Sequence, residues 1–168
     1  MESTTGNAKT PEAEFIEASR IFLRDDYLPK LLQCVNAMSD DDLWWRPNEV
    51  SNSVGNLILH LCGNVRQWIV SSVGGVEFKR NRNAEFAARG PVPKAELIAS
   101  LTLALSEVDS VLATLDAGRI LQRVKVQTYD VSVLQAVYHV VEHFGYHLGQ
   151  ILYVYKMRTG TDPQFYKF

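Results

Sequence analysis

The sequence has few cysteines, little net charge and no long apolar run, and each shortage excludes a class of protein. Only two cysteines, Cys34 and Cys62, occur in 168 residues, which excludes a disulfide framework and predicts buried, reduced thiols. The formal net charge of −2 does not favour nucleic acid or an acidic membrane surface as a partner. Because no apolar stretch is long enough for a membrane span and residues 1–10 hold no hydrophobic signal core, we expect a cytoplasmic protein.

The composition is that of an ordinary globular domain. Hydrophobic residues make up 46% of the chain and charged residues 21%, which excludes a disordered or collagen-like chain. A chain of this length is expected to fold as one domain with a substantial core. We expect that domain to span residues 11–168, preceded by a disordered N-terminus over residues 1–10.

Four segments with helical spacing of apolar residues predict four long helices. The segments are Pro11 to about Ala37, Asn52 or Ser53 to about Val73, Pro93 to about Leu115, and Asp130 or Ser132 to about Met157 or Arg158. Pro29 lies inside the first segment and is expected to kink it at Tyr27–Leu28. With no secure strand and no internal repeat, the pattern predicts an all-α four-helix bundle with long connectors after helices 1, 2 and 3.

The connectors and the tail allow further predictions. Trp44 and Trp45 are expected to cover one end of the core. The connector over residues 76–92 is typical of a solvated basic loop, since it carries Lys79, Arg80, Arg82 and Arg89. Residues 121–129 alternate between apolar and polar side chains, which permits a short extended stretch. In the tail, we expect the aromatic side chains to fold back over apolar surface; they are Phe165, Tyr166 and Phe168.

The four histidines form a pattern that suits a metal ion. His139, His143 and His147 are spaced by four residues on the last predicted helix, so successive rings differ by only about 40° around the axis and two of them can reach one ion. His60, in the second predicted helix, is the only histidine elsewhere. Three ligands with an open position are typical of catalytic zinc sites. A set of His60, His143 and His147 would suit zinc, nickel, iron or manganese.

The same residues permit interpretations without such a site. The side chains that share a face with His60 are typical of the solvent face of an amphipathic helix; they are Ser53, Asn56, Asn64, Gln67 and Ser71. The histidines of the last helix can be core residues held by hydrogen bonds. His139 to His143 also matches the H-x-x-E-H pattern of inverted zinc peptidases, but the only acid after Glu142 is Asp162, which argues against that chemistry.

Two segments resemble one protein family. NSVGNLILHLCGNVRQW, from Asn52 to Trp68, resembles the second helix of DinB-like proteins, most of all their DUF1572 branch. HVVEHFGYHLGQI, from His139 to Ile151, resembles the H-x-x-x-H-R-G-Q signature of their last helix. The stretches LPK at residues 28–30 and WWRP at residues 44–47 fit as well.

The resemblance implies a fold, a metal site and an assembly. It implies a four-helix bundle that binds a divalent metal through His60, His143 and His147, and a homodimer. His139 can then be a neighbour of the ligands, an alternative ligand or a proton carrier. Leu148 stands where the family often has arginine, so no function of that charge is implied for this chain.

The resemblance also implies an activity. Members with an assigned activity resemble transferases that use a low-molecular-weight thiol. In such an enzyme, a metal with an open position lowers the pKa of the coordinated thiol and so favours the reactive thiolate. Other members are described as metal-dependent hydrolases, which need a general base beside the bound water. No carboxylate shares the helix face of His143 and His147, which favours thiol transfer.

We therefore expect a metal-dependent enzyme that transfers a thiol to a small molecule, with zinc or nickel ahead of iron or manganese. A metal-dependent hydrolase, or a non-catalytic protein with a structural metal, is the alternative. His139 and Asn64 are the candidate catalytic residues. Asn56 and Gln67 can orient a ligand or simply be solvated.

Overall fold

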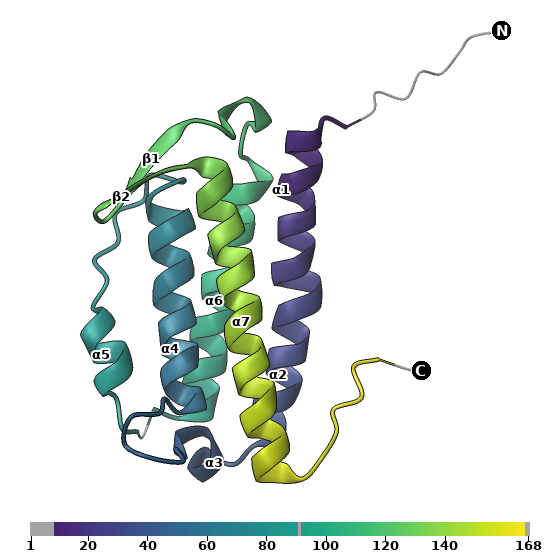
Figure 1. Cartoon of the computed structure of the whole chain (residues 1–168), viewed down its shortest axis with the longest axis vertical. Coiled ribbons are helices and arrows are strands. Elements are labelled where there is room, and N and C mark those ends of the chain that lie inside the picture. Colours follow the sequence, from purple (N-terminus) through teal and green to yellow (C-terminus); the bar gives the residue numbers. More distant parts are fainter. Residues whose placement is uncertain (1–8, 91, 167–168) are drawn as a thin grey trace, which may run out of the picture.

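The computed structural model describes residues 9–90 and 92–166. Long helical segments pack side by side as a bundle, with a small hairpin at one end (Figure 1). The predicted all-α four-helix bundle is therefore confirmed, with the hairpin as a minor addition. The prediction of disorder for residues 1–10 falls mainly on residues 1–8, which lie outside the described part of the chain.

The first helical segment is continuous but not uniform. It comprises α1 (Pro11–Ile21), a π-helical turn (Phe22–Tyr27) and α2 (Leu28–Ala37), so its predicted end at Ala37 is correct. Pro29 lies in the first turn of α2. Proline has no N–H and its ring crowds the carbonyl one turn earlier, and the wider π turn directly before it accommodates both features.

Capping side chains mark where the second long helix and the short connector helices begin. Ser53 caps α4 (Val54–Val65), and a π-helical turn (Arg66–Ser71) extends that helix. The third long helix is α6 (Lys94–Ala113). Each of the first two predicted connectors contains a short helix that the sequence analysis missed: α3 (Asp40–Trp44), capped by Ser39, and α5 (Arg82–Ala87), capped by Asn81.

The segment before the last helix is a hairpin. Strand β1 (Arg123–Val126) pairs in antiparallel register with β2 (Tyr129–Ser132), from Arg123 opposite Ser132 to Val126 opposite Tyr129. The sequence allowed one extended stretch but not this pair, because β2 does not continue the alternation of β1. Ser132 ends β2 and caps α7 (Val133–Thr159), and Gly160 closes that helix with a φ of 65°, a conformation that glycine adopts without strain.

The connector over residues 74–93 determines the topology. It leaves the far end of α4, runs back along the outside of the molecule through α5, and enters α6 near the level where α4 began (Figure 1). Helices α4 and α6 therefore run in the same direction, and the first segment and α7 run in the opposite one. As a result α4 lies between α5 on its outer side and α7 on another, and both of these neighbours contact it.

One hydrophobic core fills the bundle, and two of the aromatic side chains expected to cover it, Trp44 and Phe165, pack against it. Trp44 packs against the core and its Nε1 donates to the carbonyl of Val92 at 3.3 Å. Cys34 and Cys62 are free and buried, as predicted. The prediction for the tail is wrong for Tyr166, which is 66% exposed and accepts a hydrogen bond from Lys30; Phe168 lies outside the described residues.

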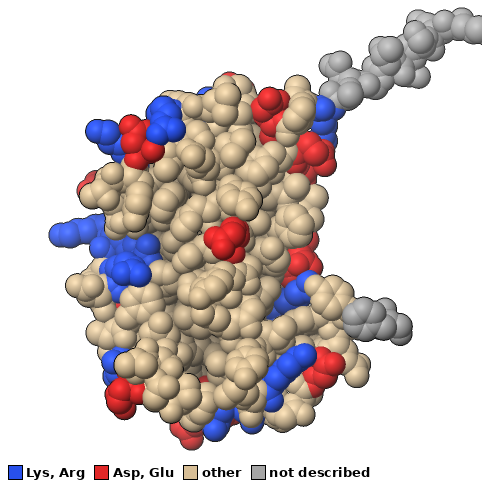
Figure 2. All heavy atoms as spheres, viewed as in Figure 1, with Lys and Arg blue, Asp and Glu red and all other residues tan. Residues whose placement is uncertain are grey.

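No described helix combines the length and the apolar character that crossing a bilayer requires. On the face that carries α7, charged side chains gather mainly toward the edges, apart from an acidic patch near the centre (Figure 2).

Candidate metal centre

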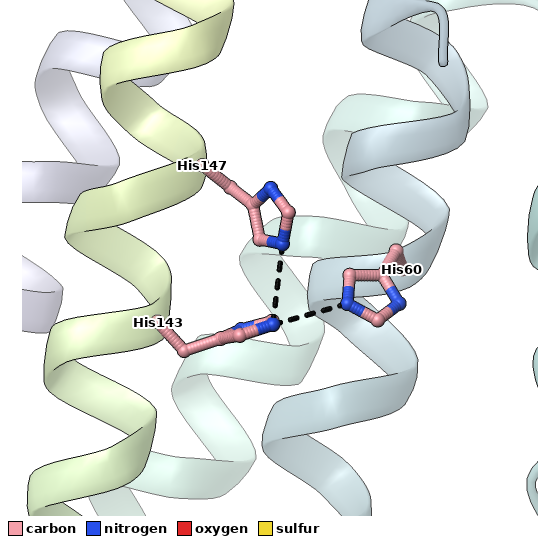
Figure 3. A group of neighbouring side chains, drawn as sticks. All are labelled: His60, His143 and His147. Atoms are coloured by element: carbon pink, nitrogen blue, oxygen red, sulfur yellow. Dashed lines mark hydrogen bonds between the residues drawn. The ribbon is translucent and has the colours of Figure 1, made fainter. Parts of the chain in front are cut away.

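Three imidazoles meet between α4 and α7. His60 comes from the middle of α4, and His143 and His147 lie one turn apart on α7, with all three rings pointing toward one another (Figure 3). The Nε2 atom of His143 is 3.1 Å from that of His60 and 3.2 Å from that of His147. One nitrogen from each residue lies within 4.8 Å of the other two, a spacing compatible with ligands of one ion at about 2 Å from each nitrogen.

The outer nitrogens of two rings are held by acceptors. The Nδ1 atom of His60 is 3.0 Å from Glu85 Oε2, and the Nδ1 atom of His147 is 2.7 Å from Gln150 Oε1. A carboxylate or amide oxygen accepts a proton and cannot donate one. Both rings therefore carry their proton on Nδ1, and both Nε2 atoms turn a lone pair toward the centre.

Arg80 lies close to the same nitrogen of His60 without changing this assignment. Its Nη2 atom is 2.9 Å from His60 Nδ1, 2.7 Å from Glu85 Oε2 and 3.4 Å from the carbonyl of His60. The two protons on Nη2 have oxygen acceptors available. A bare Nδ1, in contrast, would place its lone pair against the Glu85 carboxylate.

His143 cannot satisfy both of its own nitrogens in this arrangement. Its Nδ1 atom is buried and has no hydrogen-bond partner. With the proton on Nδ1, a buried donor is unpaired and three lone pairs face one another. With the proton on Nε2, only one of the two neighbouring lone pairs is satisfied and Nδ1 lacks a donor. A cation at the centre would satisfy three nitrogens at once, so the residues fit a divalent metal.

Burial disfavours the charged form of the two histidines on α7. Desolvation, reinforced by the neighbouring imidazoles, lowers the pKa of His143 to about 3. Desolvation also lowers the pKa of His147, although the hydrogen bond with Gln150 opposes the shift. Neutral imidazole is the form that binds a metal ion, so His143 and His147 are in their binding form at neutral pH.

A buried ion pair backs the cluster on the outer side of α4. Arg80 donates from Nε to Glu85 Oε1 at 2.7 Å, and the two side chains are only 5% and 10% exposed. Burial by itself would raise the pKa of Glu85, but hydrogen bonds from Arg80 and His60 outweigh it and hold that pKa below its ordinary value. Arg80 also donates to Gln67 Oε1 at 3.1 Å. The expectation of a solvated loop is therefore wrong for Arg80.

Glycine on α4 makes room for this ion pair. A Cβ atom at Gly63 would overlap Glu85 Oε1 and lie 2.9 Å from Arg80 Nε. Two turns before it, Asn56 Nδ2 donates to the carbonyls of Glu85 and Ala88, both at 2.9 Å. The polar face of α4 thus binds the connector that contains α5.

This contact corrects the solvent-face interpretation of α4. The first four polar residues of that face are at most 4% exposed; they are Ser53, Asn56, His60 and Asn64. The helical pattern shows which side chains share a face but not what covers them. Here the connector and α7 cover the polar stripe, and hydrogen bonds replace water.

His139 and Asn64 lie beside the cluster. Among the described residues the converging group does not include His139, whose ring lies against that of Trp68 at a tilt of 38°, with 4.0 Å between centroids. Asn64 Nδ2 is 3.4 Å from His139 Nε2, and Asn64 Oδ1 is buried without a partner. Glu142 is exposed and also absent from the converging group, so the arrangement of inverted peptidases is not formed.

Sequence reasoning did not find the roles of Glu85, Arg80 and Gln150. Glu85 is 25 positions from His60, and only the return path of the connector brings the two together. One signal was present: Glu85 is the only acid between Glu77 and Glu96, in a stretch rich in basic residues.

The fold and the site together define a helical bundle whose second and last long helices bring three histidines together. The model of the family described as "Protein of unknown function (DUF1572)" matches residues 13–166, and the chain belongs to this family. This agrees with the resemblance seen in the sequence.

Solved structures support the same fold. A conserved protein from Enterococcus faecalis is 14% identical, with a TM-score of 0.72 over 86% of this chain and 97% of that one. A DinB-like protein from Bacillus cereus is 12% identical, with a TM-score of 0.64 over 83% of this chain and 91% of that one. No curated protein matches the sequence.

Proposed function

We propose that this protein binds one divalent metal ion through His60, His143 and His147 and uses it to transfer a thiol to a small molecule. The observation that carries the proposal is the convergence of three Nε2 atoms, two of them with lone pairs fixed inward by Glu85 and Gln150. Zinc or nickel suits three imidazole ligands best. A bound ion of this kind lowers the pKa of a coordinated thiol and supplies thiolate at neutral pH.

The residues around the cluster have separate tasks in this proposal. Glu85 and Gln150 hold two rings in the binding tautomer. Asn64, buried with a free acceptor, and His139, whose pKa is lowered by burial, lie where they can contact a molecule bound beside the cluster. The burial of His60 and His147 limits the access of water.

Two observations favour this function over its alternatives. A hydrolase needs a general base near the metal-bound water, and the nearest carboxylate, Glu85, is engaged by Arg80 and the outer nitrogen of His60. A structural zinc commonly has four protein ligands, whereas the converging group among the described residues has three. A set of three supports an open position for a thiol.

Metal analysis is the first test. Untagged protein is expected to contain about one divalent ion per chain, as a three-ligand site binds one ion, and His60→Ala is expected to lose it while retaining its helical circular dichroism. A wild-type protein that binds no ion after reconstitution with zinc, nickel and manganese would refute the proposal.

Cobalt then tests the chemistry. In protein loaded with Co²⁺, a small thiol is expected to add a sulfur-to-metal charge-transfer band, because thiolate enters the open position. An unchanged spectrum, together with turnover of ester or amide substrates, would favour the hydrolase instead.

A further inference from the structure

A cavity of about 560 Å³ opens beside the histidine cluster, and that volume is typical of sites for small molecules. It lies between the beginning of α4, the turn of α7 that follows the cluster, and the loop over residues 47–52. The lining residues that matter below are Asn52, Leu57, Tyr146, Gly149, Gln150 and Tyr153.

The cavity is adjacent to the metal ligands on both helices. Gln150, which lines it, is the residue that accepts from His147 Nδ1 at 2.7 Å. Tyr146, another lining residue, packs its ring against His147 edge to face, with 5.2 Å between centroids. Leu57 lies one turn before His60 on α4. A molecule in the cavity therefore occupies the space next to the cluster.

The lining is uncharged and aromatic. No aspartate, glutamate, lysine, arginine or histidine lines the cavity among the described residues. Tyr146 and Tyr153 lie two turns apart on the same side of α7, about 10 Å along the axis, and their side chains are 60% and 68% exposed. Amide groups of Asn52 and Gln150 supply neutral hydrogen bonds. Exposed aromatic rings around an uncharged space are suited to a flat, neutral ligand.

Gly149 supplies the space between the two tyrosines. It lies inside α7, where glycine weakens a helix relative to alanine. Its φ is not positive, and a Cβ atom built on it would meet nothing within 4 Å. Neither backbone conformation nor packing within the chain requires a glycine here. Gly63 and Gly55 differ in this respect, since a Cβ on either would overlap a side chain.

We infer that this cavity binds the acceptor substrate of the proposed transferase, and that the acceptor is an uncharged molecule with an aromatic ring, held between Tyr146 and Tyr153 over Gly149. The inference rests on the proposed function for its link to catalysis, but not for the binding itself. The lining contains no cationic side chain that would pair with a carboxylate or phosphate, so its surface matches a neutral ligand better than an anionic one.

Two matched probes test the inference. 2-Naphthamide is neutral, and 2-naphthoate has the same ring system with a negative charge. Calorimetric titration of the wild-type protein is expected to show at least tenfold tighter binding of the amide. Gly149→Leu, which fills the space with a side chain that favours a helix, is expected to weaken amide binding at least tenfold without lowering the melting temperature. Gly149→Ala adds only a methyl group and is expected to weaken it less.

A second variant removes a binding group instead of filling the cavity. Tyr153→Ala removes one ring without blocking the cavity and is expected to weaken amide binding several-fold. Binding of neither probe to the wild type, a preference for naphthoate, or unchanged amide binding in Gly149→Leu would overturn the inference.

Two further measurements separate the causes of failure. The zinc affinity of each variant is measured in parallel. A wild type that binds none of zinc, nickel and manganese refutes the proposed function, while amide binding can still be scored on metal-free protein. Sedimentation of the wild type and Gly149→Leu tests whether a second copy of the chain, rather than a small molecule, covers the cavity. If the substitution converts a dimer to a monomer and leaves amide binding unchanged, the cavity lies in an interface between two copies of the chain.

Discussion

Gly63 offers a sharp test of how His60 is positioned. In Gly63→Ala, the new methyl group would overlap Glu85 Oε1 and crowd Arg80 Nε, so the ion pair must shift away from α4. His60 then loses the acceptor that fixes its tautomer. Loss of such a partner costs about 10- to 100-fold in metal affinity, which corresponds to about 1.4 to 3 kcal/mol.

Two opposing effects act on the free energy of unfolding of Gly63→Ala. Alanine in place of glycine inside a helix stabilises it by about 1 kcal/mol. Displacement of the buried ion pair opposes this gain; removing one partner of such a pair altogether costs about 3 to 5 kcal/mol, and a shift that keeps both partners costs a part of that. We therefore expect the metal-free Gly63→Ala protein to be less stable than the Gly149→Ala protein, as measured by urea unfolding, with zinc affinity measured by competition with a chelating dye.

Gly149→Ala is the matched control. This glycine also lies inside a long helix, but its Cβ would meet nothing within 4 Å. The control is expected to gain about 1 kcal/mol of stability from helix propensity and to keep the wild-type zinc affinity. If Gly63→Ala behaves in the same way as the control, the ion pair does not position His60 and the reasoning is wrong. Glu85→Gln retains an oxygen acceptor for His60, so its zinc affinity is expected to lie between those of Gly63→Ala and Gly149→Ala.

Two other predictions concern pH and assembly. The unfolded chain takes up a proton on His143 below its ordinary pKa of 6.5, whereas the folded chain resists protonation until about 3. The metal-free protein should therefore lose about 2 kcal/mol of stability between about pH 7 and about pH 5, and equal urea midpoints at the two values would contradict this. The homodimer remains a prediction, supported by the exposed apolar side chains Leu134 and Tyr138 on α7. Tyr138→Glu is expected to shift sedimentation from dimer to monomer, and a monomeric wild type would contradict the prediction.

The sequence predicts the long helices well because their boundaries depend on local signals. Ser53 and Ser132 each form a capping box with the residue three positions later, and the end of α7 needs only Gly160. The meeting of His143 and His147 follows from helical spacing alone. These features require no knowledge of tertiary structure.

The environment of His60 could not be predicted in this way. A polar stripe on a helix has the same pattern whether water or another segment covers it. The stripe on α4 is covered because the connector returns along it, and because Asn56 binds two carbonyls near α5. The pairing of Glu85 with His60 depends on that path, which no local signal in residues 74–93 specifies.

Leu148 tests how far the DinB-like signature extends to this chain. The signature often has arginine at this position, but Leu148 is 7% exposed and belongs to the hydrophobic core. Leu148→Arg removes about 2 kcal/mol of apolar burial and places a charge in the core. We expect a total loss of about 3 kcal/mol or more in urea unfolding.

Leu148→Met is the matched control, with an expected loss below about 1.5 kcal/mol because volume and polarity are nearly conserved. A loss below about 1 kcal/mol in Leu148→Arg would show that the long side chain extends to solvent and keeps its charge hydrated. The arginine of the signature would then be compatible with this core, and its absence would reflect function. A large loss would mean instead that the packing around Leu148 excludes arginine at this position.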